Sequence, residues 1–265
     1  MPFIPIHDAN PLKHIRRPYV AWGIILANVV AFVLQITGAF GDPQEALITY
    51  GLIPSTLTDI AERPPSLIAI PDSMTMITSA FLHADIWHLG GNMIFLWVFA
   101  DNIEDALGHT RFLAFYVLSA IGAGWALVLS DPASQIPTIG ASGAVSGVVA
   151  AYFLLHPTVR IWVLLFARIP VRLSAFWVLG AWLAYQFVAA ALGADDGVAW
   201  FAHIGGLLTG GVLVLFLRRS GVPIFDRSPK SATLVVPSGR VDEAAHLQSS
   251  GVGNEHDKRS RGPWG

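Results

Sequence analysis

The sequence predicts an all-α polytopic membrane protein, a bundle of six transmembrane helices with a long outer loop between the first two. Of its 265 residues, 54% are apolar and only 13% are charged, whereas about 25% of the residues in a soluble domain are charged. Six apolar stretches contain no Asp, Glu, Lys or Arg, and the basic residues gather in alternate connections between them. These three observations are typical of a polytopic membrane protein.

The six stretches are the candidate membrane spans. A hydrocarbon core about 30 Å thick requires about 20 apolar residues in a helix. Four stretches meet this requirement directly: residues 20–40, 112–130, 173–192 and 198–217. The other two, residues 86–100 and 139–155, are shorter, and charged or Pro-containing sequence bounds each of them.

The distribution of Lys and Arg predicts the orientation of the spans. If the N-terminus lies inside, only Arg63 of the 16 basic residues falls on the outer side. By the positive-inside rule, both termini are then cytoplasmic. The opening residues lack a basic region followed by an apolar core and a cleavage site, so we expect no cleaved signal peptide. We therefore expect a multi-pass protein of a bacterial inner (plasma) membrane.

The chain divides into a cytoplasmic N-terminal segment (1–19), a six-helix membrane domain (20–218) and a tail (219–265). The tail is rich in Ser, Gly, Pro and charges. It would bury too little apolar surface to offset chain entropy, so we expect it to be disordered. The long outer loop, 41–85, carries apolar runs, which favours a folded or interfacial element on the outer membrane surface. Residues 160–172 place an apolar run between arginines, which fits an interface-lying segment or a plain anchored loop.

Ser142 is the first candidate for chemistry. A helix from residue 140 to 155 is only roughly 24 Å long, so its outer end begins below the membrane surface. Residues 131–138 contain two prolines, and irregular backbone at this depth must be shielded by protein or line a water-filled cavity. Ser142 is thus expected at a wet, recessed helix N-terminus, where free N–H groups stabilise an oxyanion. The alternative is a small-residue packing face, with Gly143 and Gly147 spaced as in G-x-x-x-G.

His203, in the last apolar stretch, is the candidate base. Its imidazole has an ordinary pKa near 6.5, which suits proton transfer from a serine near neutral pH. Gly206 and Gly210 share its helical face and permit close approach to the small-residue face around Ser142. A hydrogen-bonded packing histidine is the alternative. No acidic residue is placed to orient the ring, so the sequence predicts a Ser-His dyad.

A third group of polar residues lies at the start of the second stretch. His88 and Asn92 are four residues apart and project from one side of a helix, as donors to a developing oxyanion must. Metal binding is the rival interpretation, since His83 is also near. However, Asn is a poor zinc ligand and no H-E-x-x-H motif occurs. We therefore expect neither a metal nor another cofactor. The chain also has no cysteine, which excludes disulfides and a thiolate nucleophile.

The chain resembles the rhomboid intramembrane serine proteases through three motifs in the family's order: His83…His88-x-x-x-Asn92, Gly140-Ala-Ser142-Gly and Ala202-His203-x-Gly-Gly-x-x-x-Gly210. The resemblance covers about residues 15–218. It implies a six-helix core with Ser142 as nucleophile and His203 as general base. It also implies an oxyanion hole formed by His88, Asn92 and the backbone N–H of Ser142, with His83 as a structural or polar residue at the mouth of the site.

The resemblance further implies that the substrates are transmembrane segments of other proteins. Such segments carry helix-breaking small residues near the outer face and enter between the second and fifth spans. Two positions depart from the family pattern. Many members have a Trp-Arg pair in the first loop where this chain reads Met74-Thr75. Some place an aromatic residue against the histidine where this chain has Ser146.

Two other classes of function compete with a protease. A catalytically inactive rhomboid-like protein would use the same fold as a membrane binding protein or chaperone, but inactive members lose the serine or the histidine and this chain keeps both. A small transporter would show interrupted helices in corresponding halves, and the sequence has only one interrupted entry, before Ser142. The expected partners are transmembrane substrates and the lipid bilayer, with no nucleic acid, and the sequence predicts no oligomeric state.

Overall fold

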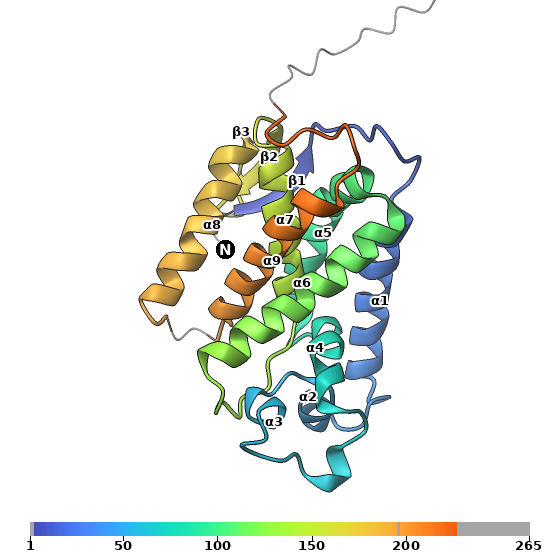
Figure 1. Ribbon diagram of the computed structural model, residues 1–265, viewed down its shortest axis with the longest axis vertical. Coiled ribbons are helices and arrows are strands. Elements are labelled where there is room, and N and C mark those ends of the chain that lie inside the picture. Colours follow the sequence, from blue (N-terminus) through green and yellow to red (C-terminus); the bar gives the residue numbers. More distant parts are fainter. Residues whose placement is uncertain (1–2, 195–196, 227–265) are drawn as a thin grey trace, which may run out of the picture. The chain divides into compact units, whose positions relative to one another are not determined.

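The computed structural model describes residues 3–194 and 197–226, which are mostly helical (Figure 1). Each of the six apolar stretches contains a helix: α1 (Tyr19–Ile36), α5 (Ile86–Leu107), α6 (His109–Ser130), α7 (Ser142–Leu155), α8 (Ala175–Ala191) and α9 (Trp200–Leu217). Among the described residues, α1, α6 and α9 are long and apolar enough to cross a bilayer. This agrees with the predicted membrane protein.

Helix α7 is short because protein surrounds it. It packs against α5, α6, α8 and α9, and most of its residues, from Gly143 to Tyr152, are buried. Its 14 residues span only about 21 Å. The neighbouring helices shield this length from lipid, as a span shorter than the hydrocarbon core requires.

Glycine faces bring α7 and α9 into backbone contact. A Cβ atom added to Gly206 of α9 would lie 1.8 Å from the carbonyl oxygen of Gly143. One added to Gly210 would lie 2.4 Å from the Cα of Gly147. No side chain fits at either position, because real Cβ atoms do not approach so closely. The predicted close packing of these two faces is confirmed.

Helix α5 extends seven residues beyond the predicted apolar stretch, which ended at Ala100, and so includes Glu104 and Asp105. The Glu104 carboxylate accepts the N–H groups of Val20 and Ala21 at 3.0 and 2.7 Å. Helix α1 has no side-chain cap of its own, so Glu104 satisfies these free donors from a distant part of the sequence. Asp105 likewise accepts three consecutive backbone N–H groups, those of Lys13, His14 and Ile15.

The prediction of an all-α fold is wrong for two segments. A three-stranded antiparallel sheet has the order β1 (Phe3–Asp8), β2 (Arg160–Leu165) and β3 (Ile169–Ser174). Residues 160–172 therefore form most of a hairpin rather than a plain loop. The side chains of β2 alternate as in any strand, with Ile161 and Val163 fully buried and Trp162 between them exposed, but the sequence shows only a continuous apolar run over residues 161–166. The partner β1 lies more than 150 residues away, beyond the reach of local patterns.

The outer loop is folded, as predicted. It contains the helices α2 (Pro43–Tyr50), α3 (Pro54–Leu57) and α4 (Thr75–Thr78) and the 3₁₀ turns η1 (Pro65–Leu67), η2 (Asp72–Met74) and η3 (Ser79–Phe81). Arg63 is buried in this loop and pairs with Asp72 at 2.7 Å. Its guanidinium also donates to the carbonyls of Thr49 and Ile70. The one basic residue on the predicted outer side is thus neutralised inside the loop.

The predicted tail begins too early. Residues 219–226 are ordered against the helical bundle: the Arg219 N–H donates to the carbonyl of Ala106 at 2.9 Å. The N–H groups of Phe225 and Asp226 donate to the carbonyls of Leu154 and Leu155, at the C-terminal end of α7. These donors satisfy carbonyls that a helix end leaves free. The remainder of the predicted disordered tail, residues 227–265, lies outside the described residues.

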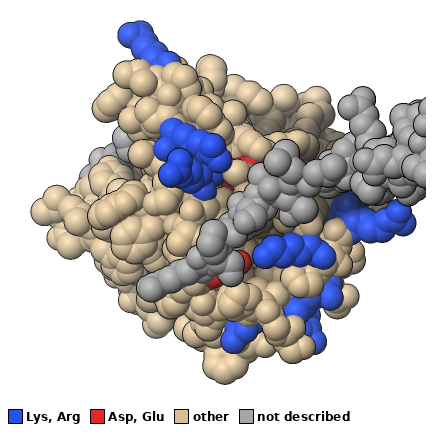
Figure 2. Space-filling view, turned by 90° about the horizontal axis from the view of Figure 1, so that it is seen from above, with Lys and Arg blue, Asp and Glu red and all other residues tan. Residues whose placement is uncertain are grey.

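Basic side chains gather at the end of the helical unit that carries the sheet (Figure 2). The exposed ones are Lys13, Arg16, Arg17, Arg111, Arg160, Arg168 and Arg172. The outer loop lies at the opposite end, at the bottom of Figure 1. The charge asymmetry read from the sequence therefore becomes an asymmetry between two ends of the helical unit.

Candidate active site

Ser142 and His203 meet, although 60 residues separate them. The Nε2 atom of His203 lies 2.8 Å from the Oγ of Ser142. Ser142 is the first residue of α7, and the residue before it, Ala141, provides no side-chain cap. The first N–H groups of α7 therefore point toward the site without a capping side chain, at the positive end of the helix dipole.

Close packing of α7 against α9 produces this contact. His203 lies in the first turn of α9, which begins at Trp200, and Ser142 lies in the first turn of α7. Gly206, one turn below His203, allows the two backbones to touch at Gly143. The packing role of the small residues and the approach of the two polar side chains are therefore parts of one arrangement.

The second ring nitrogen of His203 also has a partner, which sequence reasoning missed. Its Nδ1 lies 2.9 Å from the Oε1 of Gln186 on α8, and the Gln186 side chain is buried at 2% exposure. Because an amide oxygen can only accept, Nδ1 carries the proton and Nε2 keeps the lone pair that accepts the Ser142 O–H. The search for an orienting group considered only acids. Gln186 is the one side-chain amide in the stretch 173–192, and that was the available signal.

Trp200 and Gln186 both contact the imidazole of His203, whereas the position of α7 at which some family members have an aromatic residue is Ser146. The Trp200 ring meets that of His203 edge-on, with centroids 5.9 Å apart. Ser146 donates its hydroxyl to the carbonyl of Ser142 at 2.7 Å. The support that this departure from the family pattern required thus comes from α8 and α9.

His88 lies beside Ser142, at the start of α5. Asp85 caps α5 by accepting the N–H groups of Trp87 and His88 at 2.7 and 2.8 Å. The His88 N–H, and after it that of Trp87, keeps the pKa of the Asp85 carboxyl below its ordinary value. Gly140, at φ +120°, marks how close the ring comes: a Cβ there would lie 2.7 Å from His88 Nε2 and 3.7 Å from Ser142 Oγ.

Asn92 is buried one turn further along α5. Its Nδ2 has no hydrogen-bond partner within the described residues, so the amide is a free donor in the protein interior. Neither Asn92 nor His88 is hydrogen bonded to Ser142 in the described parts of the chain. The structure therefore brings Ser142 and His203 into direct contact, and both His88 and Ser142 lie close to Gly140.

His83, which was expected to be a structural or polar residue at the mouth of the site, is fully buried. Its ring meets that of His88 with centroids 5.1 Å apart. Gln35 of α1 holds the His83 backbone by bonding both its carbonyl and its N–H. Burial disfavours the charged imidazolium, and the nearby His88 adds to this, so the pKa of His83 falls to about 4. His83 is a neutral packing partner of His88.

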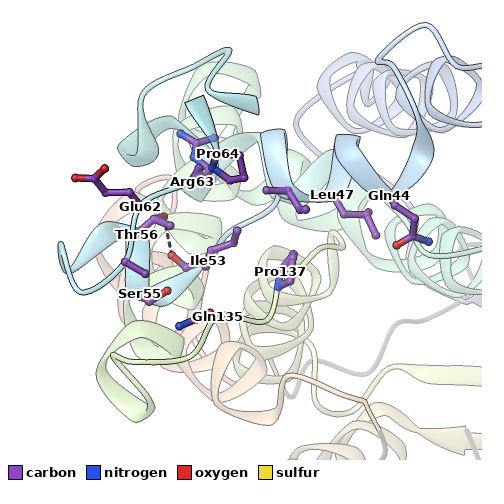
Figure 3. Close-up of a pocket in the computed structure, with 12 residues that line it drawn as sticks. Gln44, Leu47, Ile53, Ser55, Thr56, Glu62, Arg63, Pro64, Gln135 and Pro137 are labelled. Carbon is purple, nitrogen blue, oxygen red and sulfur yellow. Dashed lines mark hydrogen bonds between the residues drawn. The ribbon is translucent and has the colours of Figure 1, made fainter. Parts of the chain in front are cut away.

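Two further features bear on ligand binding. Among the described residues, no group of three or more His, Asp or Glu side chains is placed to hold a metal ion. A cavity of about 420 Å³ lies between the outer loop and residues 135–137 (Figure 3), and neither Ser142 nor His203 lines it. Its lining comprises Gln44, Leu47, Ile48, Ile53, Ser55, Thr56, Ala61, Glu62, Arg63, Pro64, Gln135 and Pro137. The Arg63 guanidinium already pairs with two carbonyls of the loop and with Asp72. The one positive charge in the lining is therefore not available to bind an anion.

Comparison with known proteins places these residues in a family. The family model described as "Rhomboid domain" matches residues 71–220. The chain is 32% identical to "RHOMBOID-like protein 6, mitochondrial" of Arabidopsis thaliana, over 79% of this chain and 74% of that protein. It is 33% identical to "Rhomboid protein 1, mitochondrial" of Saccharomyces cerevisiae, over 53% of this chain and 41% of the yeast protein. With the human "Presenilin-associated rhomboid-like protein, mitochondrial" it shares 29% identity, over 52% and 33%. The matches thus span less than half the length of the yeast and human relatives.

Proposed function

The chain belongs to the rhomboid family, and from this premise we propose that it is an intramembrane serine endopeptidase. Membership alone does not decide the activity, because the family includes both active proteases and inactive rhomboid-like proteins. The observation that carries the proposal is the 2.8 Å contact between His203 Nε2 and Ser142 Oγ. An inactive binding protein has no use for a serine paired with a correctly oriented base.

In the proposed reaction, Ser142 Oγ attacks the scissile carbonyl while its proton passes to His203 Nε2. The oxyanion that forms is stabilised by the N-terminal N–H groups of α7, His88 and Asn92. His203 then gives its proton to the leaving amine nitrogen as the C–N bond breaks, which leaves an acyl ester on Ser142. Water attacks this ester and its proton passes to Nε2. The bond from Oγ to the acyl carbon then breaks, and His203 returns the proton to Oγ, which regenerates both groups.

The proposed substrates are transmembrane segments of other proteins with helix-breaking small residues near the outer face. A helical peptide bond is sterically protected and its carbonyl is already hydrogen bonded, so the segment must unwind before cleavage. We propose entry between α5 and α8, where the facing rings of Phe95 and Trp182 lie 5.8 Å apart. Ser142 and His203 lie in the first turns of α7 and α9, at the proposed outer ends of these helices, where the substrate segment would unwind.

The six helices α1 and α5 to α9 are proposed to cross the membrane, with the basic end of Figure 2 on the side that carries β1 and residues 219–226. The expected location in a bacterial inner membrane contrasts with the names of the relatives above, which are mitochondrial proteins. We propose an inner membrane of either origin, with the basic end facing the cytoplasm or the matrix. Fractionation of cells that make the full chain tests this location.

Cleavage of a reconstituted single-span substrate tests the activity. Ser142→Ala and His203→Ala are expected to abolish cleavage and labelling by a fluorophosphonate probe, while the protein still inserts and folds. Ser146→Ala is the matched control, because it removes a neighbouring hydroxyl from the same helix and should retain labelling. Undiminished proteolysis by Ser142→Ala would remove the proposed mechanism, and a wild-type chain that folds but binds substrates without cleaving them would favour the binding protein.

A further inference from the structure

We propose that Gln186 is a positioning residue that holds His203 in the form able to act as a base, and that it makes α8 part of the catalytic site. The inference rests on the proposed protease function. The Gln186 amide oxygen lies 2.9 Å from His203 Nδ1, and His203 Nε2 lies 2.8 Å from Ser142 Oγ. Three helices, α7, α8 and α9, thus each contribute one member.

The two ring nitrogens of His203 must have different roles. A neutral imidazole carries one proton, and only the nitrogen without it can accept the serine proton. An acceptor at Nδ1 keeps the proton there and leaves Nε2 free, which is the role that a buried aspartate has in soluble serine proteases. Gln186 supplies an acceptor oxygen at this place. The negative end of its amide dipole also stabilises the positive charge that develops on the ring.

An amide suits this location better than a carboxylate. Gln186 lies in an otherwise apolar helix and is 2% exposed, where an ionised acid would lose most of its hydration. The amide provides an acceptor without that loss, although a neutral dipole stabilises an imidazolium less than a full charge does. The expected consequence is a slow protease whose base is oriented but only moderately activated.

The helix that carries Gln186 is the one beside the proposed entry route. Figure 1 shows α8 at one side of the bundle, and its outward face is exposed at Trp177, Tyr185 and Val188. A shift of α8 by more than the reach of a hydrogen bond would separate Gln186 from His203. The position of α8 therefore determines whether the base is oriented, and substrate entry and activation are coupled through one hydrogen bond.

Two substitutions in the full chain test the role. Gln186→Met keeps the length of the side chain and removes the acceptor, so kcat and the rate of fluorophosphonate labelling should fall roughly 10- to 100-fold with KM within about twofold. Gln186→Glu restores an acceptor of the same shape and should recover activity at high pH. The acidic limb of its pH–rate profile should move to higher pH, because a carboxylate stabilises the imidazolium. Tyr185→Phe is the control: it keeps the ring that packs against Trp200 and removes only a hydroxyl from the neighbouring position, so it should match the wild type.

The tautomer of His203 provides a readout besides activity. Nitrogen NMR of ¹⁵N-histidine-labelled protein, with His203→Ala to assign the signal, should show Nδ1 protonated in the wild type and a mixed population in Gln186→Met. Wild-type kcat, pH profile and tautomer in Gln186→Met would overturn the inference and leave the protease proposal standing. If Gln186→Met does not fold, an unshifted pH profile for Gln186→Glu overturns it instead. A wild-type chain with no Ser142-dependent cleavage or labelling would refute the protease proposal itself.

Discussion

At the scale of single residues, the site is built from polar side chains buried with few partners. Asn92 illustrates this, because its Nδ2 is buried and has no partner within the described chain. A buried donor without an acceptor normally costs about 1–3 kcal/mol, so its retention requires a reason. In the proposed mechanism, an oxyanion that exists only during the reaction would supply the acceptor, and this would explain the open position.

Replacement of Asn92 by Ala tests this explanation. We expect kcat on a reconstituted substrate to fall roughly 10²- to 10³-fold, the usual loss for one oxyanion donor, while thermal stability in detergent stays equal or rises. Asn28→Ala is the matched control, because Asn28 is equally buried but bonds the carbonyl of Ile24 within α1. That variant should lose stability and keep kcat. A wild-type rate for Asn92→Ala would exclude Asn92 from the oxyanion hole.

At the scale of helices, the crossing of α7 and α9 determines the geometry of the site. A Cβ atom added to Gly206 would collide with the backbone of Gly143, whereas one added to Gly211 would make only an ordinary contact, at 3.8 Å, with Leu154. One methyl group at Gly206 must therefore push the helices apart, and Ser142 and His203 with them. A separation of even 1 Å breaks a hydrogen bond of 2.8 Å.

Gly206→Ala should consequently lose activity out of proportion to stability. We expect at least a hundredfold fall in cleavage and in fluorophosphonate labelling, since small displacements of reacting groups are known to have effects of this size. Gly211→Ala should behave as the wild type in both assays. Equal activity of the two variants would show that the glycine contact does not set the distance between Ser142 and His203.

At the scale of the whole helical unit, the two ends differ in charge and in construction. The basic end carries the sheet, which joins the N-terminal segment to the hairpin between α7 and α8. Asp105 and Glu104 fix the same segment to the end of α5. The other end consists of the folded outer loop, in which Arg63 is neutralised by Asp72. A bilayer between these two ends is the arrangement that leaves the free basic charges on one side.

Single cysteines test this arrangement cleanly, because the chain contains none. Ala133 and Ser220 are exposed, neutral residues at opposite ends of the helical unit, and each is replaced by cysteine in turn. In sealed vesicles that retain the orientation of the cell membrane, an impermeant maleimide should label Ala133→Cys at once and Ser220→Cys only after permeabilisation. Labelling of both from the same side would contradict six membrane crossings.

The sequence alone determined the positions of the helices and the candidate pair Ser142 and His203. Hydropathy over about 20 residues and the spacing of Gly206 and Gly210 are local properties, so the helical positions and the close packing of α7 on α9 followed from them. The position of Ser142 at a helix start and that of His203 on a glycine face could likewise be predicted from the local sequence. Helix α5 continues past the apolar stretch that ends at residue 100, because Glu104 and Asp105 accept backbone N–H groups from a distant part of the chain.

The tertiary structure decided what depends on contacts between distant segments. The sheet exists because β1 pairs with β2 across more than 150 residues, and no local pattern announces such a partner. Residues 219–226 are ordered because the carbonyls at the end of α7 accept their N–H groups. The role inferred for Gln186 likewise depends on the one direction in which α8 packs. A hydrogen bond needs its two atoms within about 3 Å of each other, and only the folded chain determines which atoms those are.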